Sequence, residues 1–488
     1  MEPSIKISGA EIVWSYYLDV GKPVNPRQVA EQIRDLSIVK GLLVFKGPSE
    51  RHEGISDIYV SSDEAVNFLK ILELANFDVL HEEFFESQAL IRCQIQGFQI
   101  QHPYIGIAAV NVLLTVHTSG TMIFHFWTKI DQTQEIRNFY DLLLLPREEA
   151  TTDLVADLPF EVVEEYAKAV HNQDLMKRID AQRARGKKSL KMPITMTQLS
   201  MYYFRSISSN IVRNPMIGYE QIDIFPTLIV NKTNPSYEEP DQLLEKYPKQ
   251  IFTLLTLAND PSYLFVRECE RSKELLKNLS ETIDYAFLLA PESGLIIKGT
   301  KWLERLDIMS KNADQSPQDY DLYENLRFLT IIEILGLQRY ILRIITSQLV
   351  IKPLQEMSVK EVVILKNHLS EGLEMLYNTG LVSSRWHLDV LIHGKELLQI
   401  ANQQNMLLQK INIVDQAVET IHALRMEFAS VALGIIFAFV PVLIEVASQE
   451  APWSIPLALI LGATVVAVTL LGSFILSGWY WKRGQKTK

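Results

Sequence analysis

Cysteine is nearly absent from this chain of 488 residues, which contains two, Cys93 and Cys269. They lie far apart in the sequence and match no metal-ligand spacing, which argues against a disulfide framework and a zinc site. Few cysteines are typical of a reducing compartment. The N-terminal residues carry neither a basic start nor an apolar run, so we expect no signal peptide.

Sequence motifs for common enzyme chemistry are also missing. The chain has no Walker A pattern, no Gly-x-Gly-x-x-Gly, no His-Glu-x-x-His and no Gly-x-Ser-x-Gly. Its ten histidines are scattered. His117 and His125 flank a hairpin-turn signal at Thr118–Gly120, where a structural role is favoured over a ligand pair. The sequence therefore predicts no enzyme, no catalytic residue and no cofactor, and leaves any metal site unknown.

Positive charge is in deficit, because 47 Lys and Arg residues stand against 58 Asp and Glu residues, a formal net charge of −11. A general nucleic-acid binder usually presents a basic face, so we expect no nucleic-acid partner. Hydrophobic residues make up 48% of the chain, enough for a sizeable core. The length allows two or three domains of about 100–200 residues each.

Charge is missing altogether from two stretches near the C-terminus, Phe428–Ile444 and Ala451–Trp481. A helix needs about 20 apolar residues to cross a bilayer, with a range of about 17–25. We therefore expect a transmembrane hairpin: a first span at 428–447, an external loop at 448–454, a second span at 455–481 and a basic tail at 482–488.

The flanking charges predict the orientation of this hairpin. Arg425 precedes the first span, four basic residues follow the second, and the loop has no Lys or Arg. Positive flanks stay inside. We expect a multi-pass protein of the cell membrane with both termini cytoplasmic and the lipid bilayer as a partner.

Glycine and proline are absent between Gly394 and Gly434, which predicts a long helix. We expect it to run from Arg385 to Val440, with residues 381–427 as a stalk. A seven-residue repeat gives it an apolar seam that includes Ile400, Leu407, Ile411, Val414 and Val418. Either an earlier helix of the same chain or further copies of the chain could cover this seam; the second alternative predicts a homo-oligomer.

The preceding residues predict an α+β cytoplasmic domain, with a first α/β region at 1–190 and a second, α/β-to-helical region at 191–380. The predicted strands are Leu42–Phe45, Phe77–Phe85, Ala89–Ile100, Ala108–His117, Met122–Ile130, Asp223–Asn231, Tyr263–Arg267 and Gly294–Lys298. The predicted helices are Asp63–Ala75, Gln132–Leu145, Thr197–Ser209, Tyr320–Leu349 and Val359–Tyr377. Between the two regions, Lys177–Lys191 is basic and polar and predicts a boundary or exposed loop. A solvated linker is favoured there over contact with anionic lipid headgroups or a nucleotide.

The order of these parts resembles the CorA-type divalent cation transporters. That family has a cytoplasmic α/β domain, a stalk helix that enters the first span, a short external loop, a second span and a basic tail. The family's Gly-Met-Asn signature is missing, because Ile444-Glu-Val-Ala-Ser-Gln-Glu450 stands in its place. The resemblance implies a divergent member that forms a homo-pentamer around a pore, with divalent cations as the transported ions.

Six residues are candidates for an ion pathway. Glu445 and Glu450 would form acidic rings at the outer mouth or would be interfacial charges on a short loop. Ser430, Gly434, Phe437 and Pro441 recur every three or four residues and share one face, which suits a pore lining or close helix packing.

Two functions remain open on the sequence. The first is an oligomeric membrane channel or transporter for metal ions with a large cytoplasmic regulatory domain. The second is a membrane-anchored sensor or effector whose helical hairpin responds to a cytoplasmic signal.

Overall fold

The computed structural model describes residues 5–45, 56–60, 63–81, 84, 90–147, 154–212, 222–257, 273–313, 315–351, 382–448, 460 and 462–463. The chain divides into two compact units: residues 1–345 with 368–401, and residues 346–367 with 402–488. The predicted elements at 263–267 and 359–377 lie outside the described residues.

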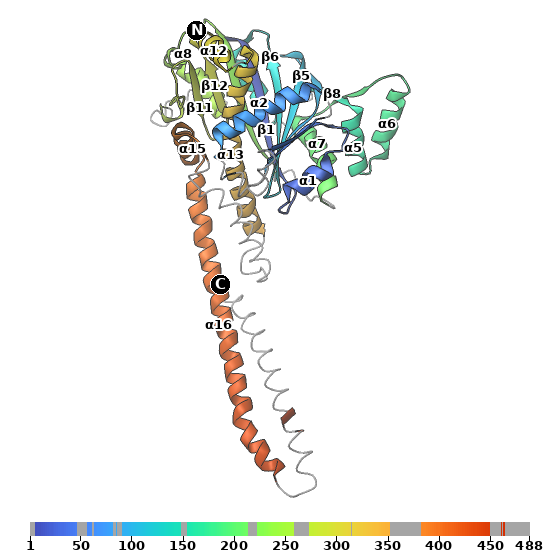
Figure 1. The fold of residues 1–488 in the computed structure, drawn as a ribbon, viewed down its shortest axis with the longest axis vertical. Coiled ribbons are helices and arrows are strands. Elements are labelled where there is room, and N and C mark those ends of the chain that lie inside the picture. The colour runs from blue at the N-terminus through green and yellow to red at the C-terminus, as the bar shows by residue number, and fades with distance from the viewer. Residues whose placement is uncertain are drawn as a thin grey trace. The chain divides into compact units, whose positions relative to one another are not determined.

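The first unit is built on one twelve-stranded sheet (Figure 1). Its main path runs β11-β12-β10-β1-β6-β5-β4-β2-β3, and β7, β8 and β9 pair beside it. Neighbours on the main path are antiparallel except β10 and β12, which are parallel. The strands are β1 (Lys6–Asp19), β2 (Val39–Phe45), β3 (Ser56–Val60), β4 (Leu90–His102), β5 (Gly106–His117), β6 (Thr121–Ile130), β7 (Gln134–Glu135), β8 (Val155–Pro159), β9 (Ser189–Pro193), β10 (Asp223–Asn234), β11 (Tyr285–Leu289) and β12 (Gly294–Lys298).

Helices cover both faces of this sheet. In the first unit they are α1 (Pro26–Ile33), α2 (Asp63–Val79), α4 (Ile136–Leu144), α5 (Phe160–Ala169), α6 (Gln173–Arg183), α7 (Met196–Ile211), α8 (Pro240–Lys246), α9 (Pro248–Thr256), α12 (Thr300–Asn312) and α15 (Arg385–Leu397). Two further helices, α13 (Pro317–Ile351) and α16 (Ile400–Ala447), contain the boundaries between the units.

Strand β1 lies in the middle of the sheet and is buried on both faces. Its even-numbered residues Ile12, Trp14 and Tyr16 belong to the main hydrophobic core, which includes side chains of α1, α4 and α7. Because successive side chains of a strand point to opposite faces, Ser15 and Tyr17 face the other way. The Tyr17 hydroxyl lies against α13, so α13 covers the second face at this point.

The sequence predicts much of this unit correctly. Strand β12 has the predicted bounds, β2, β4, β5, β6 and β10 overlap their predicted ranges, and β5 and β6 form the predicted hairpin around Thr118–Gly120. The strand predicted at 77–85 is wrong, because its first residues end α2. The linker favoured at 177–191 is also wrong, because α6 and β9 fold there with Leu175 and Ile179 buried.

The long helix differs from its prediction at both ends. It does not start at Arg385: α15 ends at Leu397, and Gln399, with φ of 54°, separates it from α16. It also does not stop before Pro441, because α16 includes this proline and continues to Ala447. Residues Ile400 and Leu407 of the predicted seam are buried within one chain, whereas the side chains of Ile411, Val414 and Val418 lie outside the described residues.

The expected transmembrane hairpin is corrected by the structure. Within the described part of the chain, no helix has both the length and the apolar character needed to span a membrane. The uncharged run in α16, between Glu427 and Glu445, is 17 residues long, the lower limit for a span of about 17–25. The second expected span, 455–481, lies outside the described residues except Ile460, Gly462 and Ala463.

The fold class is therefore a mixed α/β domain on a twelve-stranded sheet, not an α+β domain that ends in a transmembrane hairpin. The predicted location, a multi-pass protein of the cell membrane with both termini cytoplasmic, was inferred from this hairpin and is therefore wrong. The same holds for the predicted descriptions as a transmembrane protein and as an ion-transport protein.

Candidate functional site

A buried polar cluster lies where α13 covers the sheet. Ser15 of β1 and His125 of β6 are direct partners in the antiparallel register of these strands. The Ser15 Oγ lies 2.8 Å from Nδ1 of His125, and Nε2 of His125 lies 2.9 Å from Oε2 of Glu333 on α13. The same carboxylate oxygen accepts a hydrogen bond from Arg92 of β4. Four elements thus supply one serine, one histidine, one glutamate and one arginine to a single network.

The arginine is held by further polar groups. Arg92 donates to the hydroxyl of Thr115, its register partner on β5, and to Oδ1 of Asn76 on α2, at 2.8 Å. A guanidinium has five N–H donors and needs several acceptors when it is buried. The cluster therefore joins α2, α13 and the four strands β1, β4, β5 and β6 beneath the surface.

The Ser15–His125–Glu333 arrangement has the composition of a hydrolase triad without its geometry. In such triads Nε2 of the histidine faces the serine and Nδ1 faces the acid, the reverse of the order found here. Ser15 is fully buried, and His125 and Glu333 are 2% and 4% exposed. A substrate carbonyl therefore has no path to the serine hydroxyl, and the cluster is a structural network.

Glu333 is ionised in this network at neutral pH. Burial raises the pKa of its carboxyl group, but Arg92 and His125 lower it more, to about 2. The ring of His125 bridges two partners, with Nε2 facing the carboxylate and Nδ1 facing the Ser15 hydroxyl. The ion pair with the Arg92 guanidinium is the contact that most favours the charged form of Glu333.

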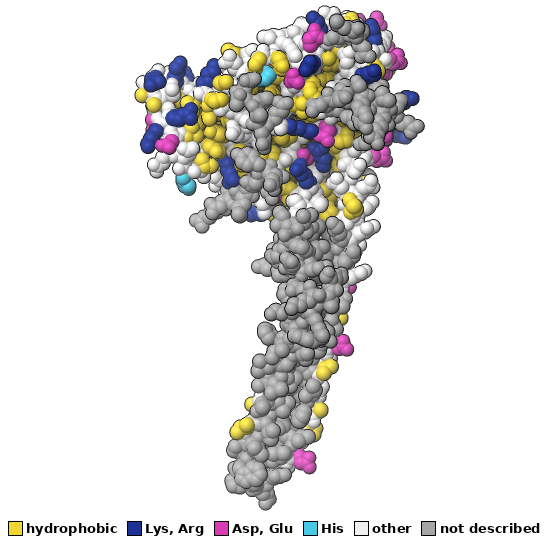
Figure 2. Space-filling model, turned by 180° about the vertical axis from the view of Figure 1, so that it is seen from behind, with side chains coloured by type: hydrophobic (Ala, Val, Ile, Leu, Met, Phe, Trp, Pro, Cys, Tyr) yellow, Lys and Arg dark blue, Asp and Glu magenta, His cyan; other side chains and the backbone are white. Residues whose placement is uncertain are grey.

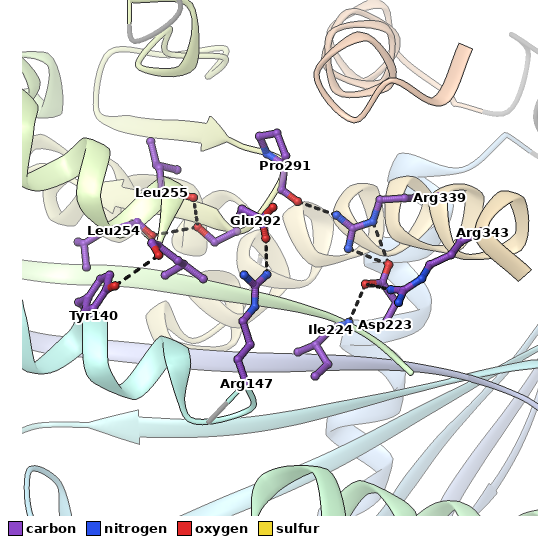
Figure 3. Close-up of polar contacts among 12 residues, drawn as sticks. Tyr140, Arg147, Asp223, Ile224, Leu254, Leu255, Pro291, Glu292, Arg339 and Arg343 are labelled. Carbon is purple, nitrogen blue, oxygen red and sulfur yellow. Dashed lines mark hydrogen bonds and ion pairs between the residues drawn. The ribbon is translucent and has the colours of Figure 1, made fainter. Parts of the chain in front are cut away.

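A second ionic contact fixes α13 further along its length. Asp223, the first residue of β10, accepts from Nε of Arg339 at 3.0 Å, and Nη1 of Arg343 lies 3.3 Å from the same carboxylate. Arg339 also donates to the carbonyl of Pro291 at 2.6 Å, as Figure 3 shows. Because both arginines contact oxygens of the same chain, this group is a clamp rather than an open anion site.

Between these two contacts α13 approaches β1 very closely. A Cβ atom added at Gly336 would lie 2.0 Å from the Tyr17 hydroxyl oxygen. Tyr17 is fully buried and packs against Tyr340, with 6.0 Å between the ring centroids. Only glycine therefore allows this approach of helix and sheet.

We expect Gly336→Ala to lower the free energy of unfolding by about 1–3 kcal/mol, because overpacking a rigid core costs more than the gain in helix propensity. Urea denaturation measures this loss. Gly9→Ala in β1 is the control, since its added Cβ would meet nothing closer than 4.0 Å. Equal stability of the two variants would contradict the tight contact.

A third ionic group holds α15 in the first unit. Arg327 of α13 lies 2.6 Å from Asp78 of α2 and 2.9 Å from Glu324. Its Nη2 donates to Nε2 of His387 on α15 at 3.2 Å. Burial, followed by the nearby Arg327 charge, lowers the pKa of His387 to about 4. Neutral His387 thus serves as a hydrogen-bond acceptor for a cation.

The candidate ion-pathway residues lie on one helix. Ser430, Gly434, Phe437, Pro441 and Glu445 are all exposed residues of α16, whereas Glu450 lies outside the described residues. None of the five contributes to the buried networks of the first unit. Among the described residues, no group of three or more His, Cys, Asp or Glu side chains could hold a metal ion.

The same side of α16 exposes large apolar side chains, of which the sequence-based candidates include Phe437. Met426, Leu433, Phe437 and Ile444 are each more than half exposed. Their spacing of seven, four and seven residues places them in one row along the helix, because an α-helix has 3.6 residues per turn. Ser430, Gly434 and Ala438, all exposed, form the neighbouring row at intervals of four. We call these two rows the α16 face.

Comparison with protein-family models, with curated proteins and with solved structures gave no match. The resemblance to the CorA-type transporters therefore has no support beyond the order of parts in the sequence.

Proposed function

We propose that this chain is a non-enzymatic regulatory protein that self-associates through α16. The observation that carries the proposal is the α16 face, where a row of large apolar side chains runs beside a row of small ones. Single exposed apolar residues are common, but a contiguous apolar stripe marks an interaction surface.

A second copy of the chain is the partner that this face fits. Helices pack by placing the ridge of one into the groove of the other. The row that contains Leu433 and Phe437 is a ridge, and the row that contains Ser430 and Gly434 is a groove, so two copies are complementary to each other. Glu427 and Glu445, near the two ends of the face, would lie at a solvated rim.

A cation channel or transporter is not part of this proposal. That hypothesis required two membrane spans, which the described helices do not provide. The homo-oligomer and the regulatory role are retained from the sequence-based hypotheses, and the self-association now rests on the exposed residues of α16 instead of the predicted seam.

We expect the purified full chain to have at least twice the mass of one chain, 55.8 kDa, in light scattering coupled to gel filtration. Leu433→Glu with Phe437→Glu should weaken association at least 100-fold, because the interface would bury two unpaired carboxylates. Gln28→Glu with Gln242→Glu is the control: it adds the same charge at exposed positions of α1 and α8, outside α16. A monomeric wild-type chain, or equal dissociation of both variants, would refute the proposal.

A further inference from the structure

The basic stretch at 177–191 is ordered on α6 and the turn before β9, and its cations divide into two groups. Arg183 is structural, since it pairs with Glu164 and its guanidinium lies 5.4 Å from the Phe160 ring centroid. Lys191 donates to the side chain of Gln101 at 2.8 Å. The remaining five are exposed: Lys177, Arg178, Arg185, Lys187 and Lys188. We call these five residues the α6 patch.

Four members of the α6 patch have no ion pair with any described residue: Arg178, Arg185, Lys187 and Lys188. Lys177 lies 3.6 Å from the exposed Asp174, and Asp180 pairs with Arg183 at 3.8 Å. Figure 2 shows Lys and Arg side chains gathered at the end of the body that holds α6. In a chain of net charge −11, this concentration of unpaired positive charge is a local exception.

Stabilisation of α6 does not account for the whole patch. Cations near a helix C-terminus interact favourably with the helix dipole, by about 0.3–1 kcal/mol within the last turn. Arg183 already occupies that turn. Lys187 and Lys188 follow Gly186, whose φ of 72° ends the helical path.

The surroundings of the patch favour one kind of anionic partner. Protein interfaces are centred on aromatic or apolar anchors. Between residues 173 and 193 the described chain exposes no large hydrophobic side chain, so such an anchor is missing there. Interfaces with nucleic-acid backbones are instead polar and strongly positive. Single-stranded nucleic acid would need exposed aromatic side chains for base stacking, which are also missing from these residues.

We propose that the α6 patch binds the phosphate backbone of a nucleic-acid duplex without reading its sequence, which replaces the expectation of no nucleic-acid partner drawn from the net charge of the whole chain. A duplex presents regularly spaced phosphates, with one charge per about 1.7 Å of B-DNA axis, and α6 with its 11 residues is about 16 Å long. The helix and turn therefore span several phosphates. This site is separate from the α16 face, and its test does not depend on self-association.

Fluorescence anisotropy of the full chain with 20-base-pair DNA and RNA duplexes tests the proposal. We expect binding whose logarithmic dependence on salt has a slope of about −3 to −4, from four neutralised phosphates. Affinity should then fall on the order of 100-fold between 50 and 200 mM salt. A single strand of the same length should bind more weakly than the duplexes.

The decisive variant replaces Arg178, Arg185, Lys187 and Lys188 by Gln and should bind duplex at least 100-fold more weakly. The matched control replaces Lys22, Lys70, Arg137 and Lys232 by Gln, which removes the same charge from exposed positions outside the patch. The control should stay within about twofold of the wild type. Three results would overturn the proposal: no duplex binding at 50 mM salt, equal losses in both variants, or equally effective competition by polyglutamate, which would indicate an acidic protein.

Discussion

Glu333→Gln should lower the free energy of unfolding by about 3–5 kcal/mol, although glutamine has nearly the same shape as glutamate. The substitution removes the carboxylate that pairs with Arg92, which is 2% exposed and held between Asn76 and Thr115. An uncompensated charge inside a protein costs far more than the loss of one neutral hydrogen bond. Chemical denaturation followed by circular dichroism measures the change.

A double-mutant cycle separates the charge effect from general damage to the core. Arg92→Met combined with Glu333→Met should destabilise the chain less than either single change, because no buried charge remains. As a control, Asp307→Asn breaks the exposed pair with Lys311 and should change stability by about 1 kcal/mol or less. If the loss of unfolding free energy in the double variant equals the sum of the losses in the two single variants, the buried ion pair does not hold α13 on the sheet.

This network shows which parts of the candidate site can be predicted from the sequence and which cannot. His125 falls inside a correctly predicted strand, and its structural rather than metal-binding role was favoured on the sequence. Its partner Glu333 lies 208 positions away on another element, and no local pattern relates the two residues. Ser15 was missed because β1 is buried on both faces and so lacks the alternation of polar and apolar residues that identifies a half-buried strand.

Two errors in the helical regions have equally specific causes. The charge of the basic stretch at 177–191 predicts a linker, yet Leu175 and Ile179, one turn apart, anchor α6 to the core. The break between α15 and α16 depends on the left-handed backbone at Gln399, a residue type that does not favour this conformation. Charge and composition describe the surface of these segments, but the packing of a few apolar side chains decides their structure.

Lowering the pH from 7 to 5 should reduce the free energy of unfolding by about 2 kcal/mol for each of two histidines, His117 and His387. Burial lowers the pKa of His117 to about 4, and burial followed by the Arg327 charge lowers the pKa of His387 to about 4. The unfolded chain binds protons on both residues near pH 6.5, whereas the folded chain does not. Protonation between pH 6.5 and 4 therefore favours the unfolded state.

The hydrogen bonds explain why the folded state resists protonation. Nδ1 of His117 accepts the backbone N–H of Ser119 at 3.1 Å, so a proton on that atom would break the bond. Nε2 of His387 accepts from Nη2 of Arg327 at 3.2 Å, so a proton there would face a guanidinium. Glu333 does not contribute in this window, because its stabilisation is lost only as the pH falls from about 4.5 toward 2.

Urea denaturation of the full chain at pH 7 and pH 5 measures the effect. The wild type should lose about 4 kcal/mol, and His117→Gln or His387→Gln should each remove about half of this pH dependence. His171→Asn is the control, because His171 is exposed and has a positive φ of 54° that asparagine tolerates. A loss that is unchanged in the variant carrying both Gln substitutions would show that other groups titrate in this range.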